Sequence, residues 1–229
     1  VRGLSKRYEL HTGFLPSLLG RRAPEVGAVD DVEIDIRKSE VVALAGESGS
    51  GKTTLGKLLA MLEPPTSGDI FFDGVRLNAL SGSEKRAMRR RIQMIFQDPY
   101  ESLDPRFTIF QTLQEPLIVH GTGEDTRSHR QIAREALDRV ELRPPDEFLD
   151  RYPYELSGGQ RQRVAVARAV ILHPDFIVAD EPVSMMDASV RAGVMNTLLR
   201  LKDELSLTYL FITHDLAVAR YMADRICIM

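Results

Sequence analysis

The chain has 229 residues, 43% of them hydrophobic, and carries a formal net charge of -3 at pH 7. This length and apolar content are enough for one domain with a subdomain, while the slightly acidic balance argues against a surface that mainly binds nucleic acid. Cys227 is the single cysteine and no apolar run reaches the ~18 residues of a membrane span, so the sequence excludes an internal disulfide, a cysteine metal site and a membrane-spanning helix.

The N-terminal part of the sequence predicts a small antiparallel layer of strands. Strand-like segments lie at residues 1–8, 28–37 and 70–73, and the pair Asp73-Gly74 marks a turn after the third.

Residues 46–54 read GESGSGKTT and fit the pattern G-x-x-x-x-G-K-[ST] of a phosphate-binding loop. The apolar run before the loop predicts a buried strand, and the spacing of leucines after it predicts a helix. Glycines let the backbone N–H groups turn inward, Lys52 adds a full positive charge, and the Thr53 hydroxyl can ligate Mg²⁺. The candidate phosphate-binding residues are Gly46, Glu47, Ser48, Gly49, Ser50, Gly51, Lys52, Thr53 and Thr54.

A second buried strand is predicted at residues 92–96 and ends at Gln97. Beyond it, Asp98-Pro99 and Asp104-Pro105 interrupt the chain, and residues 128–140 carry apolar side chains on one helical face. We expect a helical subdomain over residues 98–171, inserted into a core made of residues 1–97 and 172–229.

Two carboxylates, Asp180 and Glu181, follow the predicted strand at residues 176–179. They should lie at the carboxyl edge of the sheet, where open α/β sheets bind ligands. Because Mg²⁺ prefers oxygen ligands, Asp180 is the candidate metal ligand, and Glu181 is the candidate general base for an attacking water. Further strands at residues 209–212 and 225–228 complete a mainly parallel core.

Residues 156–171 read LSGGQRQRVAVARAVI, and this stretch resembles the ATP-binding subunits of ABC transporters. Other motifs of that family follow over essentially the whole chain: Gln97 matches the Q-loop glutamine, Ser184-Met185-Met186-Asp187 occupies the D-loop, and His214 matches the switch histidine. The resemblance implies an α/β fold of the P-loop NTPase type, with a mainly parallel core sheet, an N-terminal antiparallel β layer and an inserted helical subdomain.

The resemblance also implies what the residues do. ATP and Mg²⁺ would be bound, Gln97 would sense the metal or the water, and His214 would contact the γ-phosphate and position the water beside Glu181. Tyr8 is the candidate aromatic that stacks on adenine, with an ordinary strand residue as the alternative. The candidate catalytic residues are Lys52, Gln97, Glu181 and His214, and the candidate metal residues are Thr53, Gln97 and Asp180.

In the family, the LSGGQ helix of one subunit faces the γ-phosphate bound by the other, so that two ATP molecules are buried between two subunits. Ser157 is a good helix N-cap, and the glycines after it let backbone N–H groups approach a phosphate closely. The second subunit would be a related or identical chain. The residues implied in this contact are Ser157, Gly158, Gly159, Gln160 and Asp187.

Three stretches, QDPYESLDPRFT, YPYELSGGQRQRVAVARA and ADEPVSMMDASVRAGVMNTL, resemble the ATPases of oligopeptide, dipeptide and nickel importers. The resemblance implies permease subunits as partners, indirectly a solute-binding protein, no nucleic acid, and a peripheral position at the cytoplasmic face of the inner membrane. We therefore expect an ATP-hydrolysing subunit that powers a membrane importer of oligopeptides, dipeptides or a similar small solute. The alternatives to this function are a non-transport ABC ATPase of DNA repair or translation, and a nucleotide-switched interaction module.

Two features depart from the family pattern. The D-loop usually has Ala-Leu where this chain has Met185-Met186, which puts the contacts across the subunit boundary in question. The chain also starts at Val1 and stops at Met229, where the subfamily continues with more strands. We therefore expect an excised domain that lacks the C-terminal extension.

Overall fold

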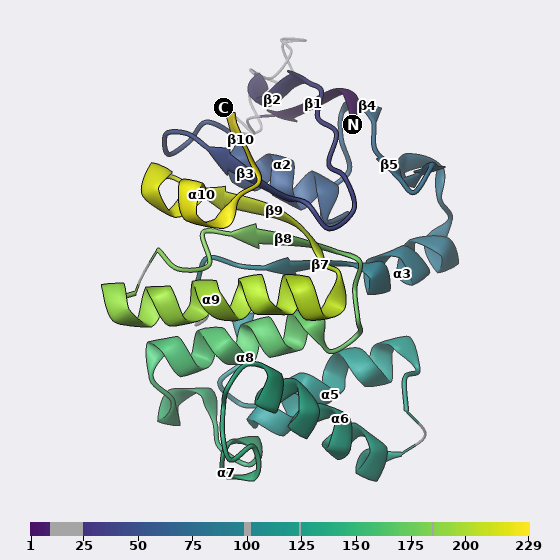
Figure 1. Ribbon diagram of the computed structural model, residues 1–229. Helices are drawn as coiled ribbons and strands as arrows, with labels where there is room; N and C mark the ends of the chain where they lie inside the picture. The colour runs from purple at the N-terminus through teal and green to yellow at the C-terminus, as the bar shows by residue number, and fades with distance from the viewer. Residues whose placement is uncertain (10–24, 99–101, 124, 185) are drawn as a thin grey trace, which may run out of the picture.

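The computed structural model describes residues 1–9, 25–98, 102–123, 125–184 and 186–229. Within them, five parallel strands form a sheet in the order β10-β3-β9-β8-β7 (Figure 1). This sheet confirms the predicted parallel core, and the loops after β3, β7, β8 and β9 leave it at the same edge. The strands are β3 (Val41–Ala45), β7 (Ile92–Ile95), β8 (Phe176–Asp180), β9 (Thr208–Thr213) and β10 (Arg225–Ile228).

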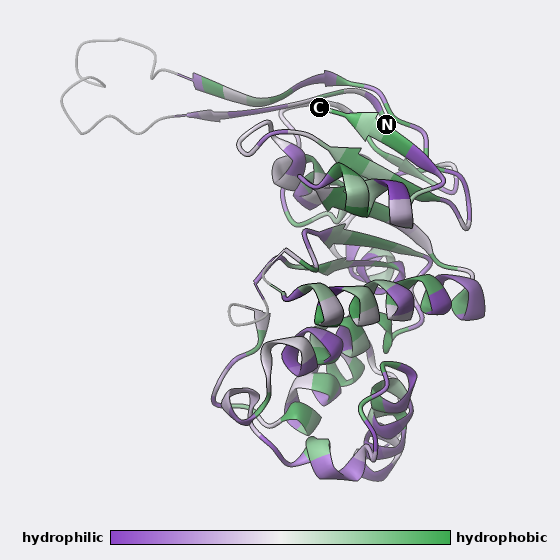
Figure 2. Ribbon diagram, turned by 60° about the vertical axis from the view of Figure 1, so that its left-hand side comes forward, coloured by the Kyte–Doolittle hydropathy of each residue, from purple (hydrophilic) through white to green (hydrophobic). Residues whose placement is uncertain are grey.

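Each face of the sheet packs against its own helices, which are α2 (Lys52–Leu59), α8 (Gly158–Val170), α9 (Ala188–Leu205) and α10 (Leu216–Met222). On one face, Val178 and Ile212 pack in a core with α2 and the antiparallel layer. On the other, Ala179 and Phe211 share a core with α8, α9 and α10. Because side chains alternate along a strand, the apolar runs of β8 and β9 supply both cores. Figure 2 shows these strands as hydrophobic.

A three-stranded antiparallel sheet in the order β2-β1-β4 covers α2, as predicted for the N-terminal part. Its strands are β1 (Arg2–Glu9), β2 (Glu25–Val32) and β4 (Ser67–Asp69). The prediction of a strand over residues 28–37 is wrong at its end. β2 stops at Val32 because its pairing with β1 ends where Leu4 lies opposite Val32.

The predicted strand over residues 70–73 does not join this layer. Instead, β5 (Phe71–Phe72) pairs with β6 (Val75–Arg76) in a separate hairpin. Asp73 and Gly74 have φ values of 48° and 78°, the left-handed backbone that a two-residue hairpin turn requires. The turn was therefore predicted correctly, but the partner of the strand was not. The hairpin is followed by a 3-10 turn, η1 (Leu77–Ala79), and by α3 (Gly82–Arg91).

The segment between β7 and β8 is helical and lies at the end of the molecule opposite the antiparallel sheet (Figure 1). Its elements before α8 are α5 (Ile109–His120), α6 (Thr126–Arg139), α7 (Asp146–Leu149) and the 3-10 turn η2 (Pro153–Glu155). α6 confirms the helix predicted over residues 128–140. One continuous core joins these helices to the sheet, so the division into a core and a subdomain at residues 97/98 and 171/172 stays a prediction.

Candidate active site

The phosphate-binding loop joins the end of β3 to the start of α2, and neighbouring backbone presses against it. Gly51 has a φ of 97°, and a Cβ there would lie 2.0 Å from the carbonyl oxygen of Ala28. At Gly46 a Cβ would lie 2.1 Å from the carbonyl oxygen of Met229. At Gly49, in contrast, a Cβ would meet no atom within 4 Å. Glycine is thus required by packing at two positions, while the third borders open space that can admit a phosphate.

Lys52, the first residue of α2, folds its side chain back into the loop. Its ammonium group donates to the carbonyl oxygens of Gly46 and Glu47 at 3.0 and 2.5 Å, and to Ser50 Oγ at 3.2 Å. Lys52 is only 5% exposed, and a buried charge requires such partners. A full positive charge is therefore held at the centre of the loop. Of the remaining loop residues, Ser48 and Thr53 are exposed and Thr54 is half-buried.

Thr53 and Asp180 meet across the gap between α2 and the end of β8. Thr53 Oγ1 donates to Asp180 Oδ1 at 3.2 Å, and Asp180 is 3% exposed. Burial raises the pKa of Asp180 above its ordinary value, and the hydrogen bond from Thr53 opposes this shift. Mg²⁺ prefers oxygen ligands, and a desolvated carboxylate beside a hydroxyl offers two of them. These two residues therefore fit the predicted metal site.

Glu181 faces two other predicted residues. Its Oε2 accepts a hydrogen bond from Gln97 Nε2 at 3.1 Å and lies 3.0 Å from His214 Nδ1. The three side chains follow β8, β7 and β9, which are neighbours in the sheet. A carboxylate fixed by two polar neighbours, with 15% of its side chain exposed, is arranged as a general base should be.

The backbone explains why two adjacent carboxylates point to different partners. Asp180 is still part of β8, whereas Glu181 has a φ of 44° and donates its N–H to the carbonyl oxygen of Ile212 at 3.0 Å. This left-handed residue turns the chain at the strand end, and such backbone outside glycine is uncommon enough to suggest a functional constraint. Asp180 therefore faces the phosphate loop, and Glu181 faces Gln97 and His214.

Tyr8 lies in β1 beside the start of α2. Its hydroxyl donates to Glu63 Oε2 at 2.5 Å, and Lys6 Nζ lies 5.0 Å from the centre of its ring. Burial and the bond to Glu63 raise the pKa of Tyr8, while a hydrogen bond with Thr54 opposes this. Whether the Tyr8 ring stacks on adenine stays a prediction.

The LSGGQ stretch begins α8 with a capping box. Ser157 Oγ accepts from the N–H of Gln160 at 3.3 Å, and Gln160 Oε1 accepts from the N–H of Ser157 at 2.9 Å. At Gly158 a Cβ would meet nothing within 4 Å, which leaves the helix start open. α8 and α2 pack against opposite faces of the sheet, so the two glycine-rich helix starts belong to different sides of the molecule.

Asp187 is the N-cap of α9, at the end of the predicted D-loop. Met185 lies outside the described residues, while Ser184 Oγ donates to the carbonyl oxygen of Glu181 at 3.1 Å. Sequence reasoning missed Arg191, which donates to the Met186 carbonyl oxygen at 3.3 Å and to Asp215 Oδ2 at 3.4 Å. Asp215 caps α10, and its place before an apolar helical stretch signals that cap, but no local pattern signals the bond from Arg191.

Within the part of the chain that the structure describes, no group of three or more His, Cys, Asp or Glu residues could hold a metal ion. The candidate metal site depends instead on one carboxylate and one hydroxyl. Among the same residues, no helix is both long and apolar enough to cross a lipid bilayer.

The chain is similar to known proteins both in sequence and in structure. Residues 29–184 match the family model described as ABC transporter. A protein of Brucella ovis named for peptide import and ATP binding is 50% identical over all of this chain and 68% of its own length. The glutathione import ATP-binding protein GsiA of Salmonella paratyphi A is 46% identical over all of this chain and 36% of its own length. The dimeric ATP-binding cassette MJ0796, bound to ADP and phosphate, superimposes with a TM-score of 0.84 and 32% identity, covering all of this chain and 92% of MJ0796.

Proposed function

Because this chain belongs to the ABC transporter family, we propose that it is the ATP-hydrolysing subunit that powers a membrane importer of peptides or a similar small solute. The names of the relatives support the import of peptides. The observation that carries the enzymatic part is the meeting of Glu181 with Gln97 and His214 at the sheet edge that also holds Thr53 and Asp180.

The reaction is attack of water on the γ-phosphorus of ATP, which breaks the bond to the bridging oxygen and yields ADP and phosphate. Lys52 and the N–H groups of its loop stabilise the negative charge of the outer phosphates. Glu181 accepts a proton from the attacking water, while His214 and Gln97 keep its carboxylate in place. Thr53 and Asp180 would hold Mg²⁺, which would neutralise charge on the phosphate oxygens. We propose that Gln97, which bonds Glu181 here, also reaches the metal when nucleotide is bound.

The second half of each site comes from another subunit. Ser157 and the two glycines after it present backbone N–H groups at a helix start, which is suited to an anion. The helix that begins at their own phosphate loop packs on the opposite face of the sheet. We therefore propose that these residues, with Gln160 and Asp187, contact the nucleotide of the partner. The dimeric state of MJ0796 supports this arrangement.

We further propose that permease subunits bind this chain at the cytoplasmic face of the inner membrane, and that residues 98–171 act as the helical subdomain within a core of residues 1–97 and 172–229. The solute itself would be captured by a separate solute-binding protein. Purification of a tagged full-length chain from its host tests the partners: co-purification of membrane subunits supports the proposal, and co-purification of ribosomes or DNA contradicts it.

The substitution Glu181→Gln tests the reaction. It keeps the size and hydrogen bonds of the side chain but removes the base, so turnover by the purified complex should fall by a factor of about 10² to 10⁴ while ATP affinity is unchanged. Phosphate release and binding of a fluorescent ATP analogue measure the two effects. Full turnover by this variant would refute the role of Glu181, and a wild-type complex that never hydrolyses ATP would favour a nucleotide-switched interaction module.

A further inference from the structure

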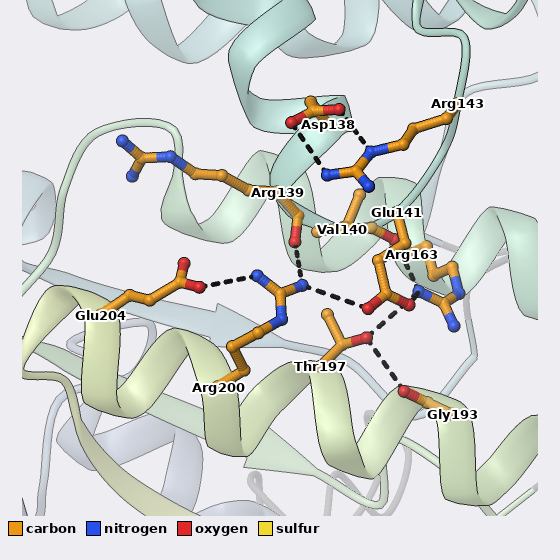
Figure 3. A network of polar contacts seen from close by, with 10 residues as sticks. All are labelled: Asp138, Arg139, Val140, Glu141, Arg143, Arg163, Gly193, Thr197, Arg200 and Glu204. Atoms are coloured by element: carbon orange, nitrogen blue, oxygen red, sulfur yellow. Dashed lines mark hydrogen bonds and ion pairs between the residues drawn. The ribbon is translucent and has the colours of Figure 1, made fainter.

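One arginine joins three helices behind the LSGGQ helix start. Arg163 lies in α8, and its Nη1 donates to the Val140 carbonyl oxygen at 2.6 Å, to Glu141 Oε2 at 2.9 Å and to Thr197 Oγ1 at 3.1 Å (Figure 3). Val140 is the C-cap of α6, and Thr197 belongs to α9. We call this group, together with Gly193 of α9, the Arg163 junction.

The junction is built closely around the guanidinium group. Thr197 is 1% exposed, and the Arg163 side chain is 19% exposed. Thr197 Oγ1 donates to the Gly193 carbonyl oxygen at 2.9 Å, which leaves its lone pairs free to accept from Arg163. A Cβ at Gly193 would lie 3.1 Å from Arg163 Nη2, so the missing side chain makes room for the planar group. A rigid fork of donors suits these acceptors, whereas a lysine ammonium group would be a poor substitute.

A second contact joins the same two helices near their first residues. A Cβ at Gly159 of α8 would lie 2.4 Å from Val190 Cγ1 of α9, so the backbone of α8 lies directly on that side chain. Together with the Arg163 junction, this contact fixes both the rotation of α8 and its position along α9. The two helices begin at Ser157 and Asp187, which are residues proposed above to reach the nucleotide of the partner.

A further arginine supports the junction from outside without touching α8. Arg200 of α9 lies 3.5 Å from Glu141 Oε1 and donates to the Arg139 carbonyl oxygen at 2.6 Å (Figure 3). Glu141 has a φ of 60°, a backbone that residues other than glycine seldom adopt. Its carboxylate accepts a hydrogen bond from Arg163 of α8 and forms an ion pair with Arg200 of α9. The loop after α6 is thereby held in the shape that offers two acceptors to Arg163.

We propose that Arg163 is a positioning residue for ATP hydrolysis, holding α8 on α9 so that Ser157 and Asp187 approach the partner-bound nucleotide as one rigid unit. The proposal depends on the function proposed above. The guanidinium of Arg163 bonds Val140, Glu141 and Thr197, so its effect on the reaction would pass through the position of α8. Its loss should weaken the step that requires two subunits and leave unchanged the binding of ATP to the Lys52 loop, which begins the helix on the other face of the sheet.

The test compares Arg163→Met with Arg143→Met in the full-length chain, purified with the subunits that co-purify with it. Arg143 bonds Asp138 of α6 at 2.6 Å and has a 65% exposed side chain. Arg143→Met therefore removes the same charge as Arg163→Met, but at a residue outside the junction. Arg163→Met should lower kcat for MgATP by about 10- to 100-fold, the usual effect of misplacing a catalytic group by an ångström or losing a supporting hydrogen bond. KM and the affinity for a fluorescent ATP analogue should stay within about twofold, and Arg143→Met should match the wild type.

Gly193→Ala gives an independent readout if Arg163→Met folds poorly. Alanine stabilises a helix interior relative to glycine, so the melting temperature should stay level or rise. The new methyl group would lie 3.1 Å from Arg163 Nη2, so the guanidinium must shift by a few tenths of an ångström, and kcat should fall by less than in Arg163→Met. Stability and turnover moving in opposite directions cannot come from a merely structural role. Unchanged kcat in both Arg163→Met and Gly193→Ala would overturn the proposal, as would a loss of ATP affinity as large as the loss of kcat. A wild-type complex without turnover would instead contradict the proposed function.

Discussion

At the scale of residues, the main feature is that two consecutive carboxylates have different surroundings. Asp180 is buried beside Thr53, and Glu181 is turned by its left-handed backbone toward Gln97 and His214. The sequence predicted which residue types would be present and at which edge they would lie. It could not predict the direction of each side chain, because that depends on one φ angle and on the strand next to it.

Asp180→Asn should stabilise the fold while abolishing activity. Burial raises the pKa of Asp180, which means that its charged form is disfavoured in the folded state and lowers stability at neutral pH. Asparagine removes this cost, so at pH 7 the melting temperature should rise. The same variant should lose Mg²⁺-dependent hydrolysis.

The difference in melting temperature between Asp180→Asn and the wild type should depend on pH, because the pKa of Asp180 is raised in the folded state. An acid with a raised folded-state pKa destabilises the fold above that pKa and ceases to do so once it is protonated. The advantage of Asp180→Asn should therefore shrink as the pH falls toward and below the ordinary value of 3.8. Melting curves at pH 7 and at acidic pH measure it, and an advantage that grew in acid would contradict the reasoning.

Gly51→Ala and Gly49→Ala form a matched pair that separates packing from backbone strain. Both glycines have positive φ, but a Cβ would lie 2.0 Å from the Ala28 carbonyl oxygen only at Gly51, while at Gly49 it would meet open space. Gly49→Ala should cost about 1 to 2 kcal/mol from the left-handed backbone alone. Gly51→Ala should cost clearly more, because α2 and β2 must separate. Denaturant unfolding compares them, and equal costs would show that the packing against Ala28 does not matter.

At the scale of elements, the sequence predicted best those strands that end in a motif. β3, β8 and β9 are fully buried and end at the phosphate loop, the carboxylate pair and the residue before His214, while β7, half-buried at its centre, ends just before Gln97. It failed where tertiary contacts decide: β5 was assigned to the wrong sheet, and α5 was not assigned at all. α5 contains Pro116, which argues against a helix, yet a capping box begins it and Leu113 and Leu117 are fully buried. Neither arginine contact, at Arg163 or at Arg191, leaves a local signal in the sequence.

Thr108→Ala tests the cap of α5. The Thr108 side chain accepts from the N–H of Gln111 at 3.2 Å, while Gln111 Oε1 accepts from the N–H of Thr108 at 2.8 Å. Removing the hydroxyl should lower stability by about 1 kcal/mol. Because α5 lies at the end of the molecule opposite the antiparallel sheet that covers α2, ATP affinity should not change. Denaturant unfolding and a binding titration check the two halves of this prediction, and a change in affinity without a loss of stability would refute it.

At the scale of the whole molecule, the chain divides its candidate site between two faces of one sheet. The Lys52 loop begins the helix on one face, and the LSGGQ helix packs on the other with α9. This separation, together with the family to which the chain belongs, is the reason for proposing that each nucleotide is completed by a second subunit. The pairing of two subunits was implied by the resemblance.

The most direct test is the structure of the full-length Glu181→Gln protein, purified with its partner ATPase subunit and bound to MgATP. The distance to measure runs from Ser157 Oγ to the nearest γ-phosphate oxygen. We predict a hydrogen bond between them, with that nucleotide held by the phosphate loop of the partner subunit. A γ-phosphate that touches Ser157 while bound to Lys52 of the same chain, or a closed complex in which Ser157 contacts no nucleotide, would contradict the account.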